Sequence, residues 1–145
     1  MGFSVIIPAR YASSRLPAKM LKEINGKSLI EHTYSNAIKS NASRVIIATD
    51  NERIKIVAEG FGAEVCMTND SHTSGTSRIA EAVSFLNFQN DDVIVNLQGD
   101  EPMMSPSAIN QVASNLVSSG MNMLKPAHII HTEEMTFVIL FKRND

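Results

Sequence analysis

Four short runs of β-forming residues constrain the fold of this chain more than any other feature of its sequence. They lie at residues 3–8, 44–49, 63–68 and 92–98, and their apolar residues are largely continuous instead of alternating with polar ones. This pattern is typical of strands that are covered by helices on both faces. The runs therefore predict a largely parallel sheet inside an α/β protein.

Helix signals lie between these runs. Ser28 and Glu31 have the spacing of a capping box, in which side chains satisfy backbone groups at the start of a helix. Thr49 and Glu52 have the same spacing. Each pair predicts the start of a helix.

The clearest helix follows the fourth run. Ser105 and Pro106 open it, Gly120 closes it, and apolar residues recur between them at the spacing of one helical face. These residues are Ile109, Val112, Ala113, Leu116 and Val117. The alternation of strands and helices predicts a Rossmann-like, mostly parallel sheet with helices on both faces. Ligands of such sheets bind beyond the carboxyl ends of the strands, so the residues after each run are the first site candidates.

Composition narrows the function further. The 145 residues, 43% of them apolar, suffice for one globular core, and a formal charge of -2 does not favour a nucleic-acid partner. Cys66 is the single cysteine, so no internal disulfide forms, which fits a reducing compartment. No stretch approaches the roughly 18 apolar residues that a membrane span requires. We expect a soluble cytoplasmic protein that contacts neither nucleic acid nor membrane.

The first candidate site follows the first run. Pro8 and Ala9 lead into a loop of small residues that carries Arg10, Arg15 and Lys19. Small side chains let backbone amides approach phosphate oxygens, and the three cations can neutralise a triphosphate and a departing pyrophosphate. The alternative is a surface turn with solvated cations. The loop has neither a Walker A nor a GxGxxG pattern, which disfavours an oxidoreductase built on a dinucleotide fold.

A polar loop at residues 69–78 follows the third run, and a helix begins near its end. Ser74 and Gly75 offer backbone groups that can pair with the edge of a nucleobase, and Arg78 lies in the first helical turn. A run of serine and threonine before a helix is more often only a cap, and that alternative stays open. His72 in this loop has no nearby partner with metal-ligand spacing.

The third candidate site follows the fourth run, where Gln98 and Gly99 precede Asp100. Nucleotidyl transfer needs Mg²⁺ to bridge phosphate oxygens, and this cation takes one or two carboxylates together with phosphates and water. Asp100 can supply one such ligand. The alternative is a turn in which Asp100 only satisfies backbone amides.

Three motifs in this order resemble the 3-deoxy-manno-octulosonate cytidylyltransferases, or CMP-KDO synthetases. They are PARYASSRLPAK at residues 8–19, CMTNDSHTSGTSR at 66–78 and VNLQGDEP at 95–102, and ATD at 48–50 also matches. The resemblance covers residues 1–120. It implies a fold of the nucleotide-diphospho-sugar transferase type. It also implies a Mg²⁺-dependent reaction of CTP with KDO that gives pyrophosphate and CMP-KDO, which is used in lipopolysaccharide biosynthesis.

The resemblance also assigns roles by position. The substrate-binding residues would be Pro8, Ala9, Arg10, Arg15, Lys19, Ser74, Gly75, Arg78 and Gln98. Among them the cations would hold the triphosphate, the residues at 74–78 would lie near the cytidine, and Gln98 would help to place the sugar. Arg10, Lys19 and Asp100 would be catalytic, with Asp100 as the metal ligand.

The sequence departs from the family in two places. The family usually has PGKP around the lysine, whereas this chain has Ala18 before Lys19, and alanine resists a positive φ. Second, residues 121–145 form a divergent tail after the CTP-binding domain at 1–120, and the family continues beyond this point with a second metal carboxylate, most sugar contacts and the homodimer surface.

We therefore expect a C-terminally truncated fold with little or no turnover, and with an exposed sheet edge that favours self-association. Two other functions stay open. One is a cytidylyltransferase for a different acid sugar, and the other is a non-catalytic remnant that binds nucleotide.

Overall fold

A six-stranded sheet with the strand order β5-β4-β1-β6-β8-β7 forms the centre of the computed structural model. The structure describes residues 2–12, 18–72, 75–88, 92–118, 128–130 and 137–140. The sheet strands are β1 (Phe3–Ala9), β4 (Arg44–Thr49), β5 (Glu64–Met67), β6 (Val93–Asn96), β7 (His128–Ile130) and β8 (Phe137–Leu140). The other elements are η1 (Lys19–Leu21), β2 (Glu23–Ile24), β3 (Lys27–Ser28), α1 (Leu29–Lys39), α2 (Glu52–Gly60), α3 (Gly75–Phe85) and α4 (Pro106–Ser118).

The four strands that the sequence predicted are all parallel. β1 lies between β4 and β6, and β5 pairs with the outer side of β4. β8 pairs antiparallel with β6, and β7 pairs antiparallel with β8. The predicted largely parallel α/β sheet is confirmed, and two short strands within residues 121–145 extend it.

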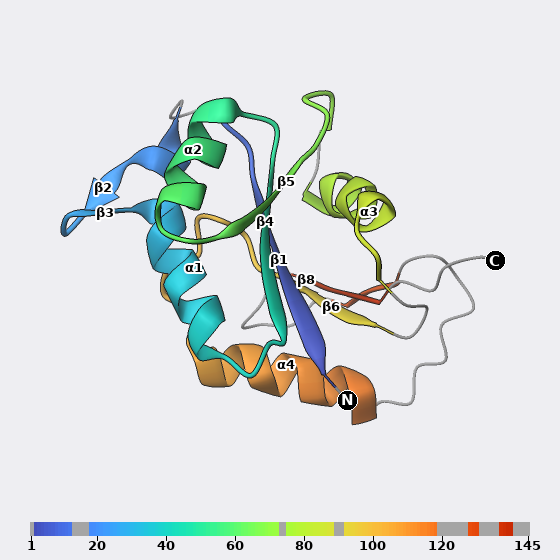
Figure 1. Ribbon diagram of the computed structural model, residues 1–145. Helices are drawn as coiled ribbons and strands as arrows, with labels where there is room; N and C mark the ends of the chain where they lie inside the picture. Colours follow the sequence, from blue (N-terminus) through green and yellow to red (C-terminus); the bar gives the residue numbers. More distant parts are fainter. Residues whose placement is uncertain are drawn as a thin grey trace.

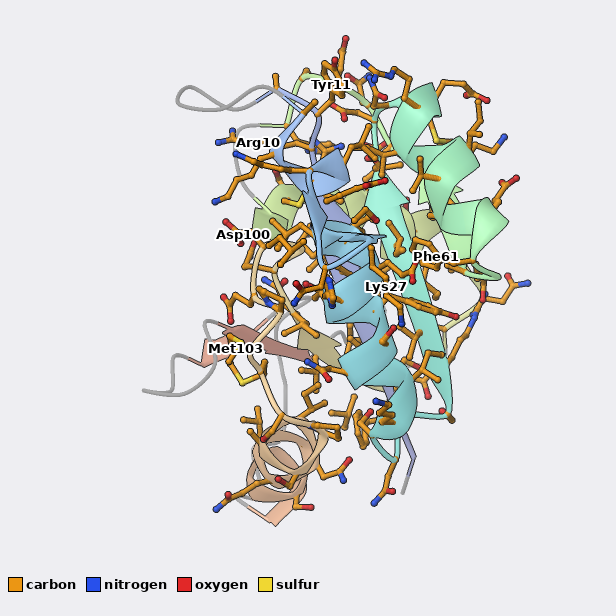
Figure 2. All side chains as sticks on the ribbon, turned by 90° about the vertical axis from the view of Figure 1, so that its left-hand side faces the viewer. Arg10, Tyr11, Lys27, Phe61, Asp100 and Met103 are labelled. Carbon is orange, nitrogen blue, oxygen red and sulfur yellow. The ribbon has the colours of Figure 1, made fainter. Side chains whose placement is uncertain are left out.

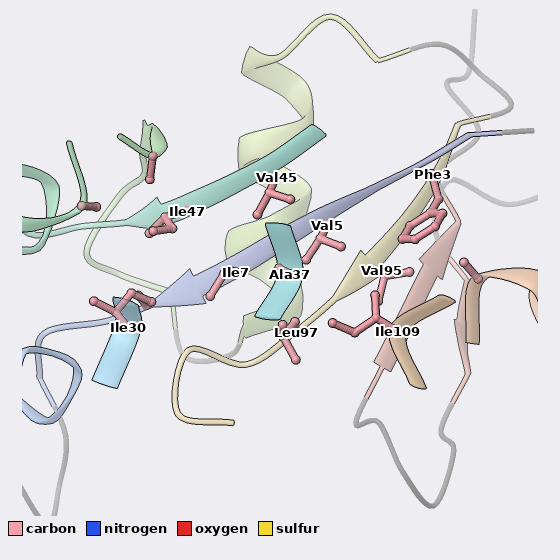
Figure 3. Close-up of a cluster of buried hydrophobic side chains, with 14 of the residues drawn as sticks. Phe3, Val5, Ile7, Ile30, Ala37, Val45, Ile47, Val95, Leu97 and Ile109 are labelled. Atoms are coloured by element: carbon pink, nitrogen blue, oxygen red, sulfur yellow. The ribbon is translucent and has the colours of Figure 1, made fainter. Parts of the chain in front are cut away.

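Helices cover both faces of the sheet (Figure 1), as the sequence predicted. Side chains of a strand point alternately to its two faces. In β1, Val5 and Ile7 belong to the core under α1, α2 and α4 (Figure 3), whereas Ile6 belongs to the core under α3. All three side chains are fully buried, and each contributes about 1.5–3 kcal/mol. Burial on both faces is the physical reason for the continuous apolar run.

Two of the three predicted helix starts are confirmed. Ser28 is the N-cap of α1, and its Oγ accepts a hydrogen bond from the amide of Glu31 at 3.3 Å. Ser105 Oγ accepts from the amide of Ala108 at 3.1 Å, just before α4. The predicted closure of that helix at Gly120 lies outside the described residues. Within the described ranges, no helix has the length and apolar character to cross a membrane.

The predicted start of α2 at Thr49 is wrong. Thr49 is the last residue of β4, and the N-cap is Asn51, whose Oδ1 accepts from the amides of Arg53 (2.8 Å) and Ile54 (3.3 Å). Thr49 Oγ1 instead accepts from the amide of Asn51 at 3.3 Å. Thr49 still belongs to the strand, whereas Asn51 lies beyond its end and can take the N-cap position of the helix.

Candidate functional site

A cleft opens at the carboxyl ends of the parallel strands. Its volume is about 230 Å³, and it is lined by Pro8, Arg10, Met20, His72, Gly75, Arg78, Gln98 and Asp100. All of them except Met20 belong to the three sequence motifs. Figure 2 shows Arg10 and Asp100 along the same edge of the molecule. The position agrees with the rule that α/β sheets bind ligands beyond their strand ends.

Lys19 and Asp100 meet at the rim of this cleft. Lys19 Nζ donates to Asp100 Oδ2 at 2.9 Å, although the residues belong to separate motifs. The two side chains are 42% and 37% exposed. An ion pair this exposed contributes at most about 1 kcal/mol, so a bound polyanion can displace it. The cations after β1 and the carboxylate after β6 therefore face the same space.

Ala18, which precedes Lys19, has a φ of 59°. This left-handed conformation favours glycine, because a Cβ crowds the neighbouring carbonyl oxygen. The backbone at Ala18 is therefore strained, at the position where the sequence departs from the family's PGKP pattern. The strain lies directly beside the lysine of the cleft.

Gly75 begins α3 and touches the amide of Gln98. A Cβ at this position would lie 3.0 Å from Gln98 Nε2 and 3.2 Å from Pro8 Cγ. Gln98 Nε2 also donates to Asn96 Oδ1 at 3.4 Å. The missing side chain at Gly75 therefore lets the end of β1, the start of α3 and the segment after β6 pack together.

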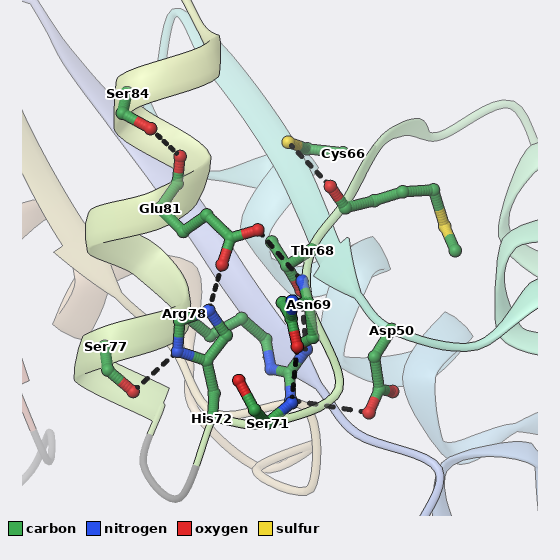
Figure 4. A network of polar contacts seen from close by, with 11 residues as sticks. Asp50, Cys66, Thr68, Asn69, Ser71, His72, Ser77, Arg78, Glu81 and Ser84 are labelled. Carbon is green, nitrogen blue, oxygen red and sulfur yellow. Dashed lines mark hydrogen bonds and ion pairs between the residues drawn. The ribbon is translucent and has the colours of Figure 1, made fainter.

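Arg78 is buried beneath the cleft and is held from several sides (Figure 4). Its side chain is 3% exposed, and it pairs with Asp50 Oδ2 at 3.5 Å. It also donates to Thr68 Oγ1 at 2.5 Å and to the carbonyl oxygen of Asn69 at 3.3 Å. The sequence indicates Asp50 only as the last residue of the matching ATD motif at 48–50. Its position after a buried strand was the signal that marks it as a site residue.

His72 lines the cleft and was not predicted as a site residue. Its Nδ1 lies 3.0 Å from Ser77 Oγ, and its Nε2 contacts a carboxylate oxygen of Glu81. Glu81 also accepts from the amide of Asn69 at 2.9 Å. The hydrogen bonds from His72 and, second, from Asn69 hold the pKa of Glu81 below its usual value. These contacts fix the loop after β5 onto α3.

The structure brings most predicted site residues together. Pro8, Arg10, Gly75, Arg78, Gln98 and Asp100 line the cleft, and Lys19 contacts Asp100. Ala9 differs, because the whole residue is fully buried in the core under α1 and does not line the cleft. Arg15 and Ser74 lie outside the described residues.

Asp100 is the residue of the cleft lining that could contribute a carboxylate to a magnesium ion. Among the described residues, no group of three or more His, Cys, Asp or Glu side chains forms a metal site. Mg²⁺ is commonly held by one or two carboxylates together with substrate phosphates and water. Asp100 provides such a carboxylate at the rim, beside the cations that suit the phosphates.

Comparisons with known proteins agree with this geometry. The chain is 65% identical over 121 residues to a 3-deoxy-manno-octulosonate cytidylyltransferase of Ruthia magnifica subsp. Calyptogena magnifica, covering 83% of this chain and 50% of the relative. The enzyme of that name from Haemophilus influenzae is 54% identical over 137 residues, covering 94% and 54%. The chain thus spans about half the length of the curated relatives it matches.

A solved structure shares the fold. It is a CMP:2-keto-3-deoxy-manno-octonic acid synthetase complexed with CTP, which matches with a TM-score of 0.77 and 35% identity over 90% of this chain and 54% of its own. The family model described as cytidylyltransferase matches residues 4–139, which is most of the chain. On this evidence the chain belongs to the cytidylyltransferase family.

Proposed function

We propose that the cleft binds CTP together with Mg²⁺ for the transfer of CMP from CTP to the anomeric hydroxyl of KDO, the reaction for which the sequence predicts little or no turnover by this chain. The products are pyrophosphate and CMP-KDO, which serves lipopolysaccharide biosynthesis. The observation that carries the proposal is the 2.9 Å contact between Lys19 and Asp100, because it joins a cation and a carboxylate from two motifs in one cleft. The names of the relatives suggest the sugar, and the CTP complex of the similar structure suggests the nucleotide.

Each part of the substrates has a place in this proposal. Arg10, Arg15 and Lys19 bind the triphosphate. Pro8 lies against the nucleotide, and the fully buried Ala9 supports it from the core. Ser74, Gly75 and Arg78 lie on the side of the cytidine, and Gln98 orients the sugar. The proposal is supported by the positions of Pro8, Arg10, Gly75, Arg78 and Gln98, which all line the cleft.

The reaction needs positioning and charge neutralisation more than covalent chemistry. The anomeric oxygen of KDO forms a bond to the α-phosphorus, the bond from that phosphorus to the bridging oxygen breaks, and the hydroxyl proton passes to solvent. Arg10 and Lys19 stabilise the negative charge that develops on pyrophosphate. Mg²⁺ held at Asp100 would supply further neutralisation at the phosphate oxygens.

We further propose that the protein acts in the cytoplasm, where CTP is available. A free, buried Cys66 suits a reducing compartment.

Calorimetry with this chain tests the nucleotide part of the proposal. With Mg²⁺ present, CTP should bind at least about tenfold more tightly than UTP or ATP, since backbone groups near Gly75 would read the base edge. Equal affinity for the three nucleotides would contradict a cytidine site.

Pyrophosphate release tests the reaction. The chain is incubated with CTP, Mg²⁺ and either KDO or a second acid sugar such as sialic acid. Release that depends on KDO supports the proposed substrate, and release only with the other sugar refutes it. Tight CTP binding without any release identifies a nucleotide-binding protein that does not transfer CMP.

A further inference from the structure

A carboxylate outside the cleft lining connects the two sides of the nucleotide site. Asp50 follows directly after β4, and its side chain is 12% exposed. Its Oδ1 accepts from the amide of Tyr11 at 3.4 Å, and its Oδ2 pairs with Arg78 at 3.5 Å. Asp50 thus contacts the loop of the phosphate-binding cations and the first turn of α3 at once.

Arg78 depends on this carboxylate for its charge balance. Its hydrogen bonds go to neutral acceptors, Thr68 Oγ1 and the carbonyl oxygen of Asn69, and the carboxylate of Glu81 acts on it only through longer-range electrostatics. A buried guanidinium that loses its counter-charge is strongly destabilised, and its surroundings rearrange. The position of Arg78 at the base of the cleft therefore rests on Asp50.

Tyr11 is fixed at both its backbone and its side chain. While Asp50 accepts from its amide, Arg53 of α2 donates to its hydroxyl at 2.7 Å and lies over its ring at 5.4 Å from the centroid. The neighbouring Arg10 lines the cleft. Asp50 and Arg53 together therefore restrict the backbone from which Arg10 extends.

We infer that Asp50 is a positioning residue of the nucleotide site, which couples the loop of Arg10 to the start of α3 through Tyr11 and Arg78. Asp50 is not among the residues that line the cleft. The inference rests on the proposed function, because it assumes that the cleft binds CTP.

The substitution Asp50→Asn separates the two contacts. Asparagine keeps an oxygen acceptor for the amide of Tyr11 but has no charge for Arg78. By calorimetry with Mg²⁺, the affinities for CTP and CMP should fall about tenfold or more, as expected on loss of a charge-assisted hydrogen bond. The affinity for inorganic tripolyphosphate should change by less than about threefold. Asp50→Ala removes both contacts and should weaken all three ligands.

Glu64→Gln is the matched control. Glu64 forms an ion pair with Arg44 at 2.5 Å, at the opposite end of the same two strands β4 and β5. This variant also removes a carboxylate from a guanidinium, but far from the cleft. It should keep the CTP affinity of the wild type within about twofold, so an equal loss in both variants would assign Asp50 a merely structural role.

Nuclear magnetic resonance tests the inference even where Asp50→Asn does not fold. In the wild-type chain, the Tyr11 amide and Arg78 Nε–H signals should shift together on CTP addition and saturate at the calorimetric Kd. Unmoved signals at saturation would overturn the inference, as would an Asp50→Asn variant that binds CTP like the wild type. A wild-type chain that binds none of the ligands refutes the proposed function itself, which distinguishes the two failures.

Discussion

At the scale of single residues, Ala18 occupies a conformation that suits glycine. Its φ of 59° costs an alanine about 1–2 kcal/mol, a strain that glycine would not have. Glycine would, however, lose more conformational entropy on folding, which offsets part of this gain. Ala18→Gly should therefore raise the free energy of unfolding in urea by about 0.5–1 kcal/mol. The same exchange at Ala80, an exposed residue in the interior of α3, should lower it by about 1 kcal/mol. A destabilised Ala18→Gly variant would contradict the strained backbone.

Gly75 should matter for binding more than for stability. A Cβ there would press on the amide of Gln98, a flexible side-chain end that can move, and on Pro8 Cγ at 3.2 Å, a contact that a shift of a few tenths of an ångström relieves. Gly75→Ala should weaken CTP binding about fivefold, the effect of one lost neutral hydrogen bond, with little change in melting temperature. Calorimetry should find no such loss for Gly60→Ala, because no atom lies within 4 Å of a Cβ at that position. Equal CTP affinities of the two variants would show that Gln98 and Gly75 do not belong to the nucleotide site.

At the scale of elements, the start of α2 depends on one side chain. Asn51 Oδ1 accepts from two amides of the first turn. Asn51→Ala should lower the free energy of unfolding by about 1 kcal/mol, while Asn51→Asp, which keeps the acceptor, should change it by only a few tenths. Urea unfolding of both variants measures this difference. An alanine variant as stable as the wild type would show that packing alone fixes the helix start.

The sequence predicted the elements whose signals are local. The apolar run of β1 and the helical spacing of apolar residues in α4 are signals that lie within the elements themselves, so the sequence predicted both elements. The start of α2 was misplaced by two residues, because Thr49 and Asn51 are both good caps and only the end of β4 decides between them. The β2–β3 hairpin was missed despite its Asn25-Gly26 turn, where φ values of 52° and 82° fit a two-residue turn between strands.

At the scale of the whole molecule, the sequence predicted where the site lies but not how it is held. Parallel strands carry their carboxyl ends to one edge of the sheet, so Arg10 and Asp100 were expected to share a cleft, and they do. The contact of Asp50 with Arg78 could not be predicted, because the packing of α3 against β4 and β5 sets it. The contact of His72 with Glu81 has the same origin.

The most direct test of this account measures CTP binding by calorimetry, with Mg²⁺ and with a chelator, in the wild type and in Asp100→Asn. Mg²⁺ should strengthen binding about tenfold or more in the wild type and hardly at all in the variant, because the variant lacks the metal carboxylate. Without Mg²⁺ the variant should bind CTP at least as tightly as the wild type, since Lys19 is released from its ion pair with Asp100. If Mg²⁺ strengthens binding equally in both proteins, Asp100 is not the metal ligand and the proposed site is wrong.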